Sequence, residues 1–482
     1  MLASDDYQLA RLLIERGLGL LYLIGFVVAL VQFPALAGER GLEPAPALLR
    51  QLRFADAPSL FQWRYSDRLL RVAALVGTVL ALAVVLGVAA ALPLPLTMAV
   101  WLGLWLLYLS IVNIGGTFYA FGWESQLCET GFLAIFLGNA ASAPPFVLLL
   151  LFRWLAFRVE FGAGVIKLRG DPCWRALTCM DYHHQTQPLP NPVSWFAHHA
   201  PRIFHRLEAL GNFVAQLVLP FGLFLPQPFA SLAALLMIAT QLYLVLTGNY
   251  AWLNWLTIVA LVAGVSDSAI ALVLPGLVPA TASLPAPPTW FAAATICLAI
   301  IVGVLSYWPV RNLLSPHQQM NRSFNAWHLV NTYGAFGSVT RRRYEVIVEG
   351  TEATQVGPAT EWREYEFKAK PGDPRRMPPQ VAPYHLRLDW LMWFIPISPG
   401  YAGDWFVRFL ARLLEADRPT LRLLRRDPFG GRRPAHVRAR LFEYRFTGFA
   451  EWRATGAWWQ REPAGELVPP VSLDRLTHAT AR

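Results

Sequence analysis

Charged residues are scarce in this chain of 482 residues. Only 15% are Asp, Glu, Lys or Arg, whereas 55% are hydrophobic. This balance excludes an ordinary soluble protein, in which about 25% of residues are charged. Apolar runs recur up to about residue 314, and runs of about 18 or more such residues are long enough to cross a bilayer. The sequence therefore predicts an integral, multi-pass membrane protein whose first partner is the lipid bilayer.

Cysteine is also rare, with four residues in the whole chain. Four cysteines neither demand nor exclude an oxidising compartment. Cys173 and Cys179 share one polar loop and would form a disulfide if their Cα atoms come close enough. Cys128 and Cys297 fall within apolar runs, where a thiol packs as a small hydrophobic group.

The familiar catalytic motifs are missing: the chain has no H-E-x-x-H, paired C-x-x-C, G-x-x-x-x-G-K-[ST] or G-x-S-x-G. The neighbours His183 and His184 would point in different directions on any regular element, so we predict no metal site and no cofactor. The net charge of +10 comes without a helix-turn-helix, zinc-finger or RRM signature. We therefore predict no nucleic-acid partner, because anionic lipid headgroups explain the basic charge more simply.

The predicted fold is a polytopic α-helical membrane bundle of about eight or nine apolar segments, followed by a mostly β C-terminal domain. The bundle takes residues 1–314, including a structured polar loop at 162–208, and the membrane-associated domain takes residues 315–482. Strand patterns cover Tyr344–Val348, Glu364–Lys368, Leu441–Thr447 and Gly456–Gln460. Helical spacing covers Asp404–Leu414, and the apolar stretch Leu386–Ile395 is expected to dock on the bundle or the membrane interface.

Charged groups in or beside the apolar segments are the catalytic candidates, because a charge in a bilayer is costly unless it is paired or used. The competing interpretation is structural pairing of the two glutamates with the two arginines. The candidates are Glu124, Glu129, Arg153, Arg158, Lys167 and His183.

Two long blocks resemble the lipase maturation factor family. FGAGVIKLRGDPCWRALTCMDYHHQTQPLPNPVSW, at Phe161–Trp195, is similar to that family's central loop. FNAWHLVNTYGAFGSVTRRRYEVIVEGT, at Phe324–Thr351, resembles the opening of its C-terminal domain. Weaker matches are WESQLCETGFL (Trp123–Leu133), GNYAWLNWLTI (Gly248–Ile258), YEFKAKPGDPRRMPP (Tyr365–Pro379) and YHLRLDWLMWF (Tyr384–Phe394).

The resemblance implies a chaperone-like membrane protein that assists the folding and maturation of secreted lipases or related exported proteins. The polar loop and the C-terminal domain would then form one client-binding surface, since structured loops on rigid scaffolds often carry binding residues. The residues expected to bind the client or to shape this loop are Lys167, Arg169, Asp171, Trp174, Asp181, Tyr182, His183, Gln187, Asn191, Trp195, Asn325, Asn331 and Tyr333.

If the nine apolar segments each cross the membrane in turn, three parts of the chain fall on one side. These parts are the Arg40–Arg68 loop, the polar loop and the C-terminal domain. Their positive charge alone predicts the cytoplasmic side. The resemblance instead implies an exoplasmic working face, on an endoplasmic-reticulum-type membrane or a bacterial inner membrane.

The alternative function is a membrane-embedded enzyme that acts on a lipid or polypeptide substrate in a polar bundle cavity. This layout is similar to that of vitamin K-dependent carboxylase-type membrane proteins. It requires the six charged candidates to line one cavity. We favour the folding factor, which requires the loop and the C-terminal domain to form one surface.

Overall fold

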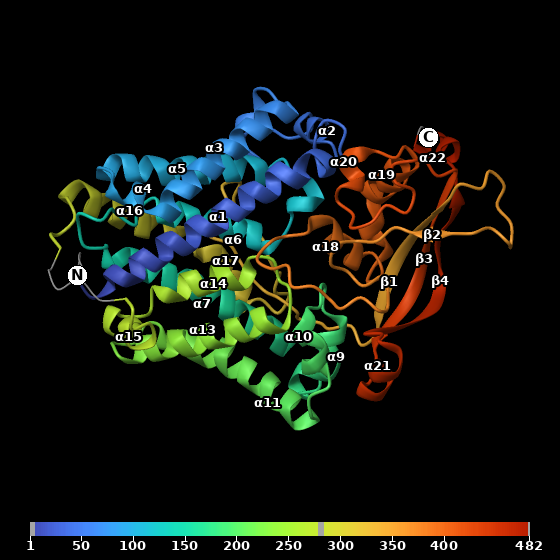
Figure 1. Ribbon diagram of the computed structural model, residues 1–482. Helices are drawn as coiled ribbons and strands as arrows, with labels where there is room; N and C mark the ends of the chain where they lie inside the picture. The colour runs from blue at the N-terminus through green and yellow to red at the C-terminus, as the bar shows by residue number, and fades with distance from the viewer. Residues whose placement is uncertain (1–4, 278–283, 481–482) are drawn as a thin grey trace.

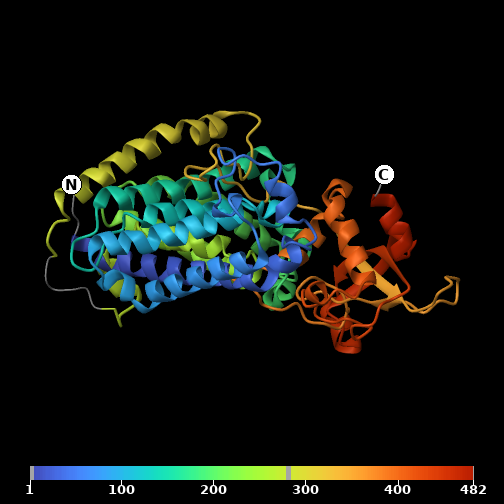
Figure 2. The same ribbon diagram turned by 90° about the horizontal axis from the view of Figure 1, so that it is seen from above.

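The long apolar helices run side by side along one axis, and the C-terminal domain lies at one end of that axis (Figures 1 and 2). The computed structural model describes residues 5–277 and 284–480. The helices of the bundle before the polar loop are η1 (Asp5–Tyr7), α1 (Gln8–Leu36), α2 (Ala45–Leu49), η2 (Leu60–Gln62), α3 (Asp67–Leu86), α4 (Val88–Ala91), α5 (Leu94–Val112), η3 (Gly116–Tyr119), α6 (Gly122–Ala134) and α7 (Phe146–Arg169).

The polar loop and the second half of the bundle are also helical. The short helices of the loop are α8 (Pro172–Arg175), α9 (Met180–Thr186) and α10 (Pro192–His198). They are followed by α11 (Arg202–Phe213), the π-helical turn η4 (Val214–Val218), α12 (Leu219–Gly222), α13 (Phe229–Thr247), α14 (Leu253–Val262), α15 (Asp267–Val273), α16 (Thr289–Leu305) and α17 (Tyr307–Leu314).

Five helices within the described ranges are long and apolar enough to cross a membrane: α1, α3, α5, α13 and the combined α16 and α17. The predicted count of eight or nine segments is not confirmed. Other apolar segments form helices that are too short, such as α14, or that carry several charges, such as α7. Small residues allow close packing of the spans, since a Cβ at Gly77 of α3 would clash with Phe26 of α1.

The C-terminal domain is a four-stranded antiparallel sheet with helices beside it. The strand order is β2-β1-β3-β4. The strands are β1 (Arg343–Thr351), β2 (Arg363–Glu364), β3 (His436–Phe446) and β4 (Trp459–Val471). The helical elements are α18 (Arg387–Phe394), η5 (Pro399–Ala402), α19 (Gly403–Leu414), α20 (Arg418–Leu421), α21 (Phe449–Thr455) and α22 (Leu473–Thr480).

The sequence predicts a mostly β domain, whereas the structure has a mixture of helices and strands in this part of the chain. Helix α19 lies where helical spacing predicts it. The apolar stretch at Leu386–Ile395 forms the buried helix α18, which packs against the bundle through Trp390 and Phe121. The strand expected at Glu364–Lys368 is short, because beyond Glu364 the chain makes only an isolated bridge between Glu366 and Arg426.

Three polar regions lie at one end of the bundle (Figure 1). They are the loop that contains α2, the loop helices α8–α10 and the C-terminal domain. Arg412 of α19 donates a hydrogen bond to the carbonyl oxygen of Arg40 at 2.8 Å. The C-terminal domain therefore contacts the α2 loop at this end of the bundle.

Residues 315–342 link the bundle to the sheet, and part of this segment lies directly against α7. An added Cβ at Gly162 would clash with the backbone carbonyl oxygen of Tyr333. We expect Gly162→Ala to destabilise the protein by about 1–3 kcal/mol, because backbone must shift to admit the methyl group. Thermal unfolding of the purified protein, followed by tryptophan fluorescence, measures this.

The matched control is Gly303→Ala on α16, where an added Cβ meets no atom within 4 Å. This variant should unfold at the same temperature as the unmodified protein or slightly above it, because Ala favours a helix more than Gly does. Equal unfolding temperatures for Gly162→Ala and Gly303→Ala would contradict the close contact between α7 and the linking segment.

Candidate functional site

The polar loop is folded because its short helices are capped by its own side chains. The carboxylate of Asp171 accepts a hydrogen bond from the backbone N–H of Cys173 at 3.0 Å and starts α8. Asn191 and Ser194 form a reciprocal capping box at the start of α10. Such caps satisfy N–H groups that a helix leaves free at its first turn. The loop is therefore held in one shape, as the sequence predicts.

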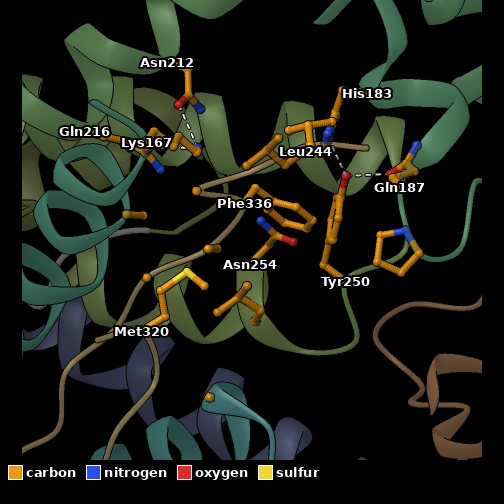
Figure 3. Close-up of a pocket in the computed structure, with 18 of the residues that line it drawn as sticks. Lys167, His183, Gln187, Asn212, Gln216, Leu244, Tyr250, Asn254, Met320 and Phe336 are labelled. Carbon is orange, nitrogen blue, oxygen red and sulfur yellow. Dashed lines mark hydrogen bonds between the residues drawn. The ribbon is translucent and has the colours of Figure 1, made fainter. Parts of the chain in front are cut away.

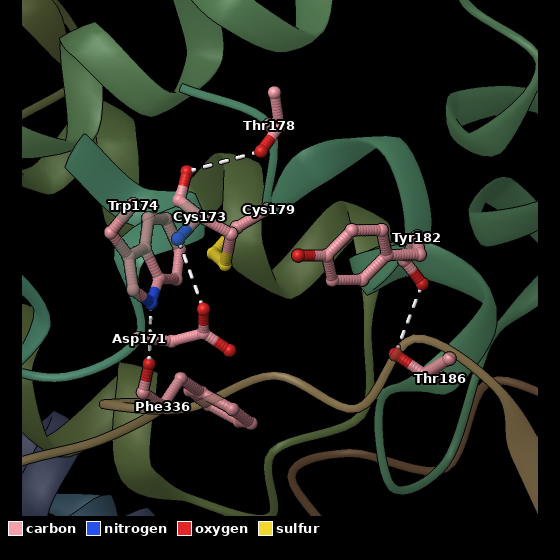
Figure 4. The surroundings of a disulfide bond; sticks show 8 residues. All are labelled: Asp171, Cys173, Trp174, Thr178, Cys179, Tyr182, Thr186 and Phe336. Atoms are coloured by element: carbon pink, nitrogen blue, oxygen red, sulfur yellow. Dashed lines mark hydrogen bonds between the residues drawn. A yellow bond between two sulfur atoms is a disulfide. The ribbon is translucent and has the colours of Figure 1, made fainter. Parts of the chain in front are cut away.

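A disulfide bond joins Cys173 and Cys179 across the turn between α8 and α9, with their Cα atoms 4.9 Å apart (Figure 4). Both cysteines are buried. The indole N–H of Trp174 donates to the carbonyl oxygen of Phe336 at 2.8 Å, and the N–H of Asp171 donates to that of Gly337 at 2.9 Å. The disulfide-linked turn is therefore fixed to the segment that leads into the sheet.

Arg343, the first residue of β1, connects the end of α9 to the sheet. Its guanidinium donates to the carbonyl oxygens of Gln185, Gln187 and Pro188, the first at 3.1 Å and the last at 2.9 Å. The same guanidinium is paired with Glu345, so its charge stays compensated although it is buried. Carbonyl groups of the loop are thus bound by a fixed cation of the C-terminal domain.

The end of the loop also packs on the same domain, against residues of β3 and β4. The indole N–H of Trp195 donates to the carbonyl oxygen of Thr447 at 3.0 Å, and its ring packs against Phe449 and Trp458. Asn191 donates to the side-chain oxygen of Gln380 at 2.8 Å. The loop and the C-terminal domain therefore form one continuous surface.

An exposed group of aromatic rings lies at this junction. Phe196 of α10 is 52% exposed and Phe449 of α21 is 49% exposed, while Trp452 and Trp458 beside them are partly exposed. Their rings contact the buried Trp195 or one another. We call Phe196, Phe449, Trp452 and Trp458 the aromatic patch.

Glu129 and Arg158 form a buried ion pair. The same carboxylate accepts from the hydroxyl of Tyr333 at 2.7 Å and from the backbone N–H of Asn331 at 3.0 Å. Arg158 also donates to the carbonyl oxygen of Asn331 at 2.7 Å. Two of the catalytic candidates thus attach the linking segment to the bundle.

Glu124 is buried and paired with Arg387 of α18, at 2.8 Å. Arg387 lies over the ring of Tyr119 at 3.5 Å. Gln32 of α1 donates to the carbonyl oxygen of His385 at 2.7 Å and accepts from the N–H of Arg387 at 3.1 Å. Burial and the nearby charge of Arg387 lower the pKa of His385 to about 4, against the effect of Glu124. His385 is therefore neutral near pH 7, and Arg387 carries the positive charge of this contact.

Arg153 has a different role, because it binds the ends of helices. Its guanidinium donates to the carbonyl oxygens of Ala263, after α14, at 2.9 Å and of Leu223, after α12, at 3.1 Å. These carbonyl groups have no partner further along their own helix. Arg153 therefore serves as a cap for two neighbouring helices.

The remaining two candidates, Lys167 and His183, line a cavity of about 850 Å³ between the bundle, α9 and the C-terminal domain (Figure 3). The ammonium of Lys167 donates to Asn212 at 2.8 Å and to Gln216 at 3.0 Å. His183 shares a hydrogen bond with the hydroxyl of Tyr250 at 3.1 Å. Burial, then the neighbouring His184 and Lys167, lower the pKa of His183 well below its usual value, so its ring is neutral.

The six catalytic candidates therefore do not meet in one site. Sequence reasoning also left out cavity residues that the fold brings together. The carboxylate of Glu160 accepts from Gln216 at 3.1 Å and from Gln241 at 2.6 Å, and Asn254 donates to Gln241 at 2.7 Å. In the sequence, Gln216 and Gln241 each lie within an apolar segment, and this is the feature that could have indicated a buried polar cluster.

The other residues predicted for the loop and the linking segment have local roles. Arg169 donates to the carbonyl oxygens of Leu313 and Ser315, both at 2.9 Å. Asp181 lies 3.4 Å from His205, and the ring of Tyr182 is half-buried. Gln187 accepts from the hydroxyl of Tyr250 and donates to Ser194 at 2.9 Å. The Asn325 side chain accepts from two backbone N–H groups, those of Trp327 and Leu329.

Known proteins that are similar to this chain align with almost its whole length. Residues 9–272 match the model of the lipase maturation factor transmembrane domain, and residues 329–469 match that of the lipase maturation factor C-terminal domain. The chain is 41% identical to Lipase maturation factor 1 of Bos taurus, with 98% of this chain and 91% of that one aligned. It is 39% identical to Lipase maturation factor 1 of Homo sapiens (98% and 90%) and 29% identical to Lipase maturation factor 2 of Xenopus laevis (97% and 83%). No solved structure matches it.

The pairing of Glu124 with Arg387 predicts strong coupling between two substitutions. Arg387→Met alone should cost about 3–5 kcal/mol, because it leaves a buried carboxylate without its partner. Glu124→Gln combined with Arg387→Met should cost clearly less than the sum of the two single changes. Thermal unfolding of the three variants tests this, and strictly additive losses would contradict a direct pair.

Proposed function

The chain belongs to the lipase maturation factor family, and from this premise we propose that it assists the folding and assembly of secreted lipases or related exported proteins. The observation that carries the proposal is the continuous surface formed by the polar loop and the C-terminal domain. Arg343, Trp195 and Asn191 hold the two parts together. A folding factor of this design needs no reactive group, because it acts by binding a client that is not yet assembled.

The aromatic patch is the proposed contact for the client. Large aromatic side chains dominate the energy of many protein interfaces, and an unassembled client still exposes the apolar surface that it later buries. Phe196 and Phe449 lie half exposed on the buried Trp195. Their exposed rings stand on a rigid base, so little side-chain freedom is lost when a client binds.

The dispersal of the six charged candidates does not support the membrane-embedded enzyme. Glu129 and Arg158 attach the linking segment, Glu124 binds α18 through Arg387, and Arg153 caps two helices. Each of these four groups is bound to another part of the protein, so we do not propose a reaction that uses them.

We further propose that the working surface faces the exoplasmic side, in an endoplasmic-reticulum-type membrane or a bacterial inner membrane. The disulfide between Cys173 and Cys179 supports this side, because disulfides persist in oxidising compartments and are rare in the cytosol. The positive charge of this end favours the cytoplasmic side, because cytoplasmic loops of membrane proteins are usually rich in Lys and Arg. This charge rule weakens for whole domains.

Substitution of the aromatic patch should lower the yield of active client. We expect Phe196→Ala combined with Phe449→Ala to reduce the specific activity of a co-expressed secreted lipase by about two- to tenfold, as expected for loss of interface anchors. The amount of lipase synthesised should stay the same. Lipase activity divided by lipase antigen is the measurement.

The matched control is Phe54→Ala, which removes an exposed ring of the α2 loop outside the aromatic patch. It should leave lipase specific activity unchanged. Unchanged activity in the double variant, at normal levels of the folding factor, would contradict the proposed client contact.

The side of the membrane is tested by labelling single cysteines with an impermeant maleimide. Cys173 and Cys179 are bonded to each other and Cys128 is buried, so the Cys297→Ser variant should show little labelling of native cysteines. In sealed cells or vesicles, Thr354→Cys between β1 and β2 should react from the exoplasmic side. Gly276→Cys, beyond α15 at the opposite end of the bundle (Figure 1), should react only after the membrane is opened. The reverse pattern would place the working surface in the cytoplasm.

A further inference from the structure

The cavity beside α7 has the composition of a ligand site that the folding role does not use. Its volume of about 850 Å³ falls within the range of about 300–1,000 Å³ that is usual for small-molecule pockets. Most of the wall is apolar and includes the rings of Phe336, Trp393 and Phe394. Figure 3 shows two polar groups on this wall: Lys167 with Asn212 and Gln216, and, apart from them, His183 with Tyr250 and Gln187. A long apolar space with one cationic region suits an amphiphile.

The polar part of the wall is built by an irregular turn in a long helix. Helices α11 and α12 are joined by the π-helical turn Val214–Val218, and Gln216 lies within this turn. Turns of this kind are rare and often lie at functional sites. Gly164 of α7 permits the close approach, since an added Cβ would lie 2.9 Å from the Cβ of Gln216. Gln216 can therefore accept from Lys167 and donate to Glu160.

Lys167 is a buried cation with no carboxylate within ion-pair distance among the described residues, although the charge of Glu160 acts on it and the ring of Trp174 lies 4.9 Å from its ammonium. Within the described ranges it makes no ion pair, and its ammonium donates to the neutral amide oxygens of Asn212 and Gln216. Two hydrogen bonds leave one of its three donors available. The carboxylate of Glu160 in the same cavity already accepts from two amide groups. One donor of the Lys167 ammonium is therefore left for a negative group, although the carboxylates of Glu160 and Glu208 also line the cavity.

The cavity reaches the outer surface of the bundle between α11 and α13. Leu207 of α11 is 59% exposed and Leu236 of α13 is 46% exposed, yet both line the cavity. Helix α13 is long and apolar enough to span the membrane. The opening therefore lies beside a candidate membrane span and is bordered by apolar side chains.

We propose that this cavity binds a single-chain anionic amphiphile, which enters from the bilayer between α11 and α13. The acyl chain lies along the apolar walls, and the negative headgroup binds the ammonium of Lys167. A fatty acid and a lysophospholipid with an anionic headgroup share this chemistry. The inference is independent of the client, because binding is measured without a lipase.

The experiment uses the full-length protein, purified, stripped of lipid and held in amphipol. The fluorescent fatty acid cis-parinaric acid should bind saturably, and oleate should displace it. Oleyl alcohol has the same chain without the charge and should displace it at least about tenfold less well, since a hydrogen bond to a charged group is lost. Comparing oleate with oleoyl-lysophosphatidylglycerol shows which headgroup binds more tightly.

Gly211 offers a way to fill the mouth of the cavity without disturbing the fold. It lines the cavity and is exposed, and an added Cβ would meet no atom within 4 Å. Gly211→Phe should weaken binding of the probe at least tenfold (about 1.4 kcal/mol per factor of ten). Gly303→Phe on α16 is the matched control, because it has the same open surroundings outside the cavity, and it should bind the probe normally.

Substitution of Lys167 tests the headgroup. Lys167→Met should lose the preference for oleate over oleyl alcohol, whereas Lys167→Arg should keep most of it. The proposal is overturned if the unmodified protein shows no saturable binding, if Gly211→Phe binds as tightly as Gly303→Phe, or if oleate and oleyl alcohol compete equally. Displacement of the probe by an apolar peptide but not by oleate would assign the cavity to a polypeptide instead. None of these results would affect the lipase-yield test of the aromatic patch.

Discussion

Buried charges that are paired across the boundary between the bundle and the C-terminal part are the constraint on which this structure depends. Glu124 of α6 accepts from Tyr108 of α5 but takes its cation, Arg387, from α18. Glu129 of α6 pairs with Arg158 of α7, and both also bind the linking segment. A carboxylate in such surroundings costs several kcal/mol unless it is paired. The bundle is therefore complete only when the later part of the chain is in place. The attachment of the linking segment to the bundle also fixes the polar loop. The same segment accepts the hydrogen bond of Trp174 and continues into Arg343, which binds the loop carbonyl groups.

Much of the architecture follows from local patterns in the sequence. The apolar runs predict the helices α1, α3, α5 and α13, and helical spacing predicts α19. Each of these features depends on composition or spacing within a short stretch, which a single sequence displays directly.

The pairing of charges could be predicted only in part. The expected pair of Glu129 with Arg158 exists, since the two residues lie on neighbouring helices. The partner of Glu124 is Arg387, which lies far along the chain, and no local pattern reveals such a contact. Arg153 binds carbonyl groups rather than a carboxylate. The cavity could not be predicted from the sequence either. Gln216 and Gln241 donate to Glu160 only after the helices that carry them have packed together.

Gln32 has a consequence for how the chain is made. It lies on the first helix, and its amide binds the backbone on both sides of Leu386, including a partner 353 residues later in the sequence. At about 5–20 residues per second of synthesis, that partner emerges roughly 20–70 s after Gln32. During this interval the amide is already inside the membrane-inserted helix without its final partner. The protein that assists the assembly of others thus passes through an unfinished state of its own, which the translocation machinery or neighbouring lipid must tolerate until translation ends.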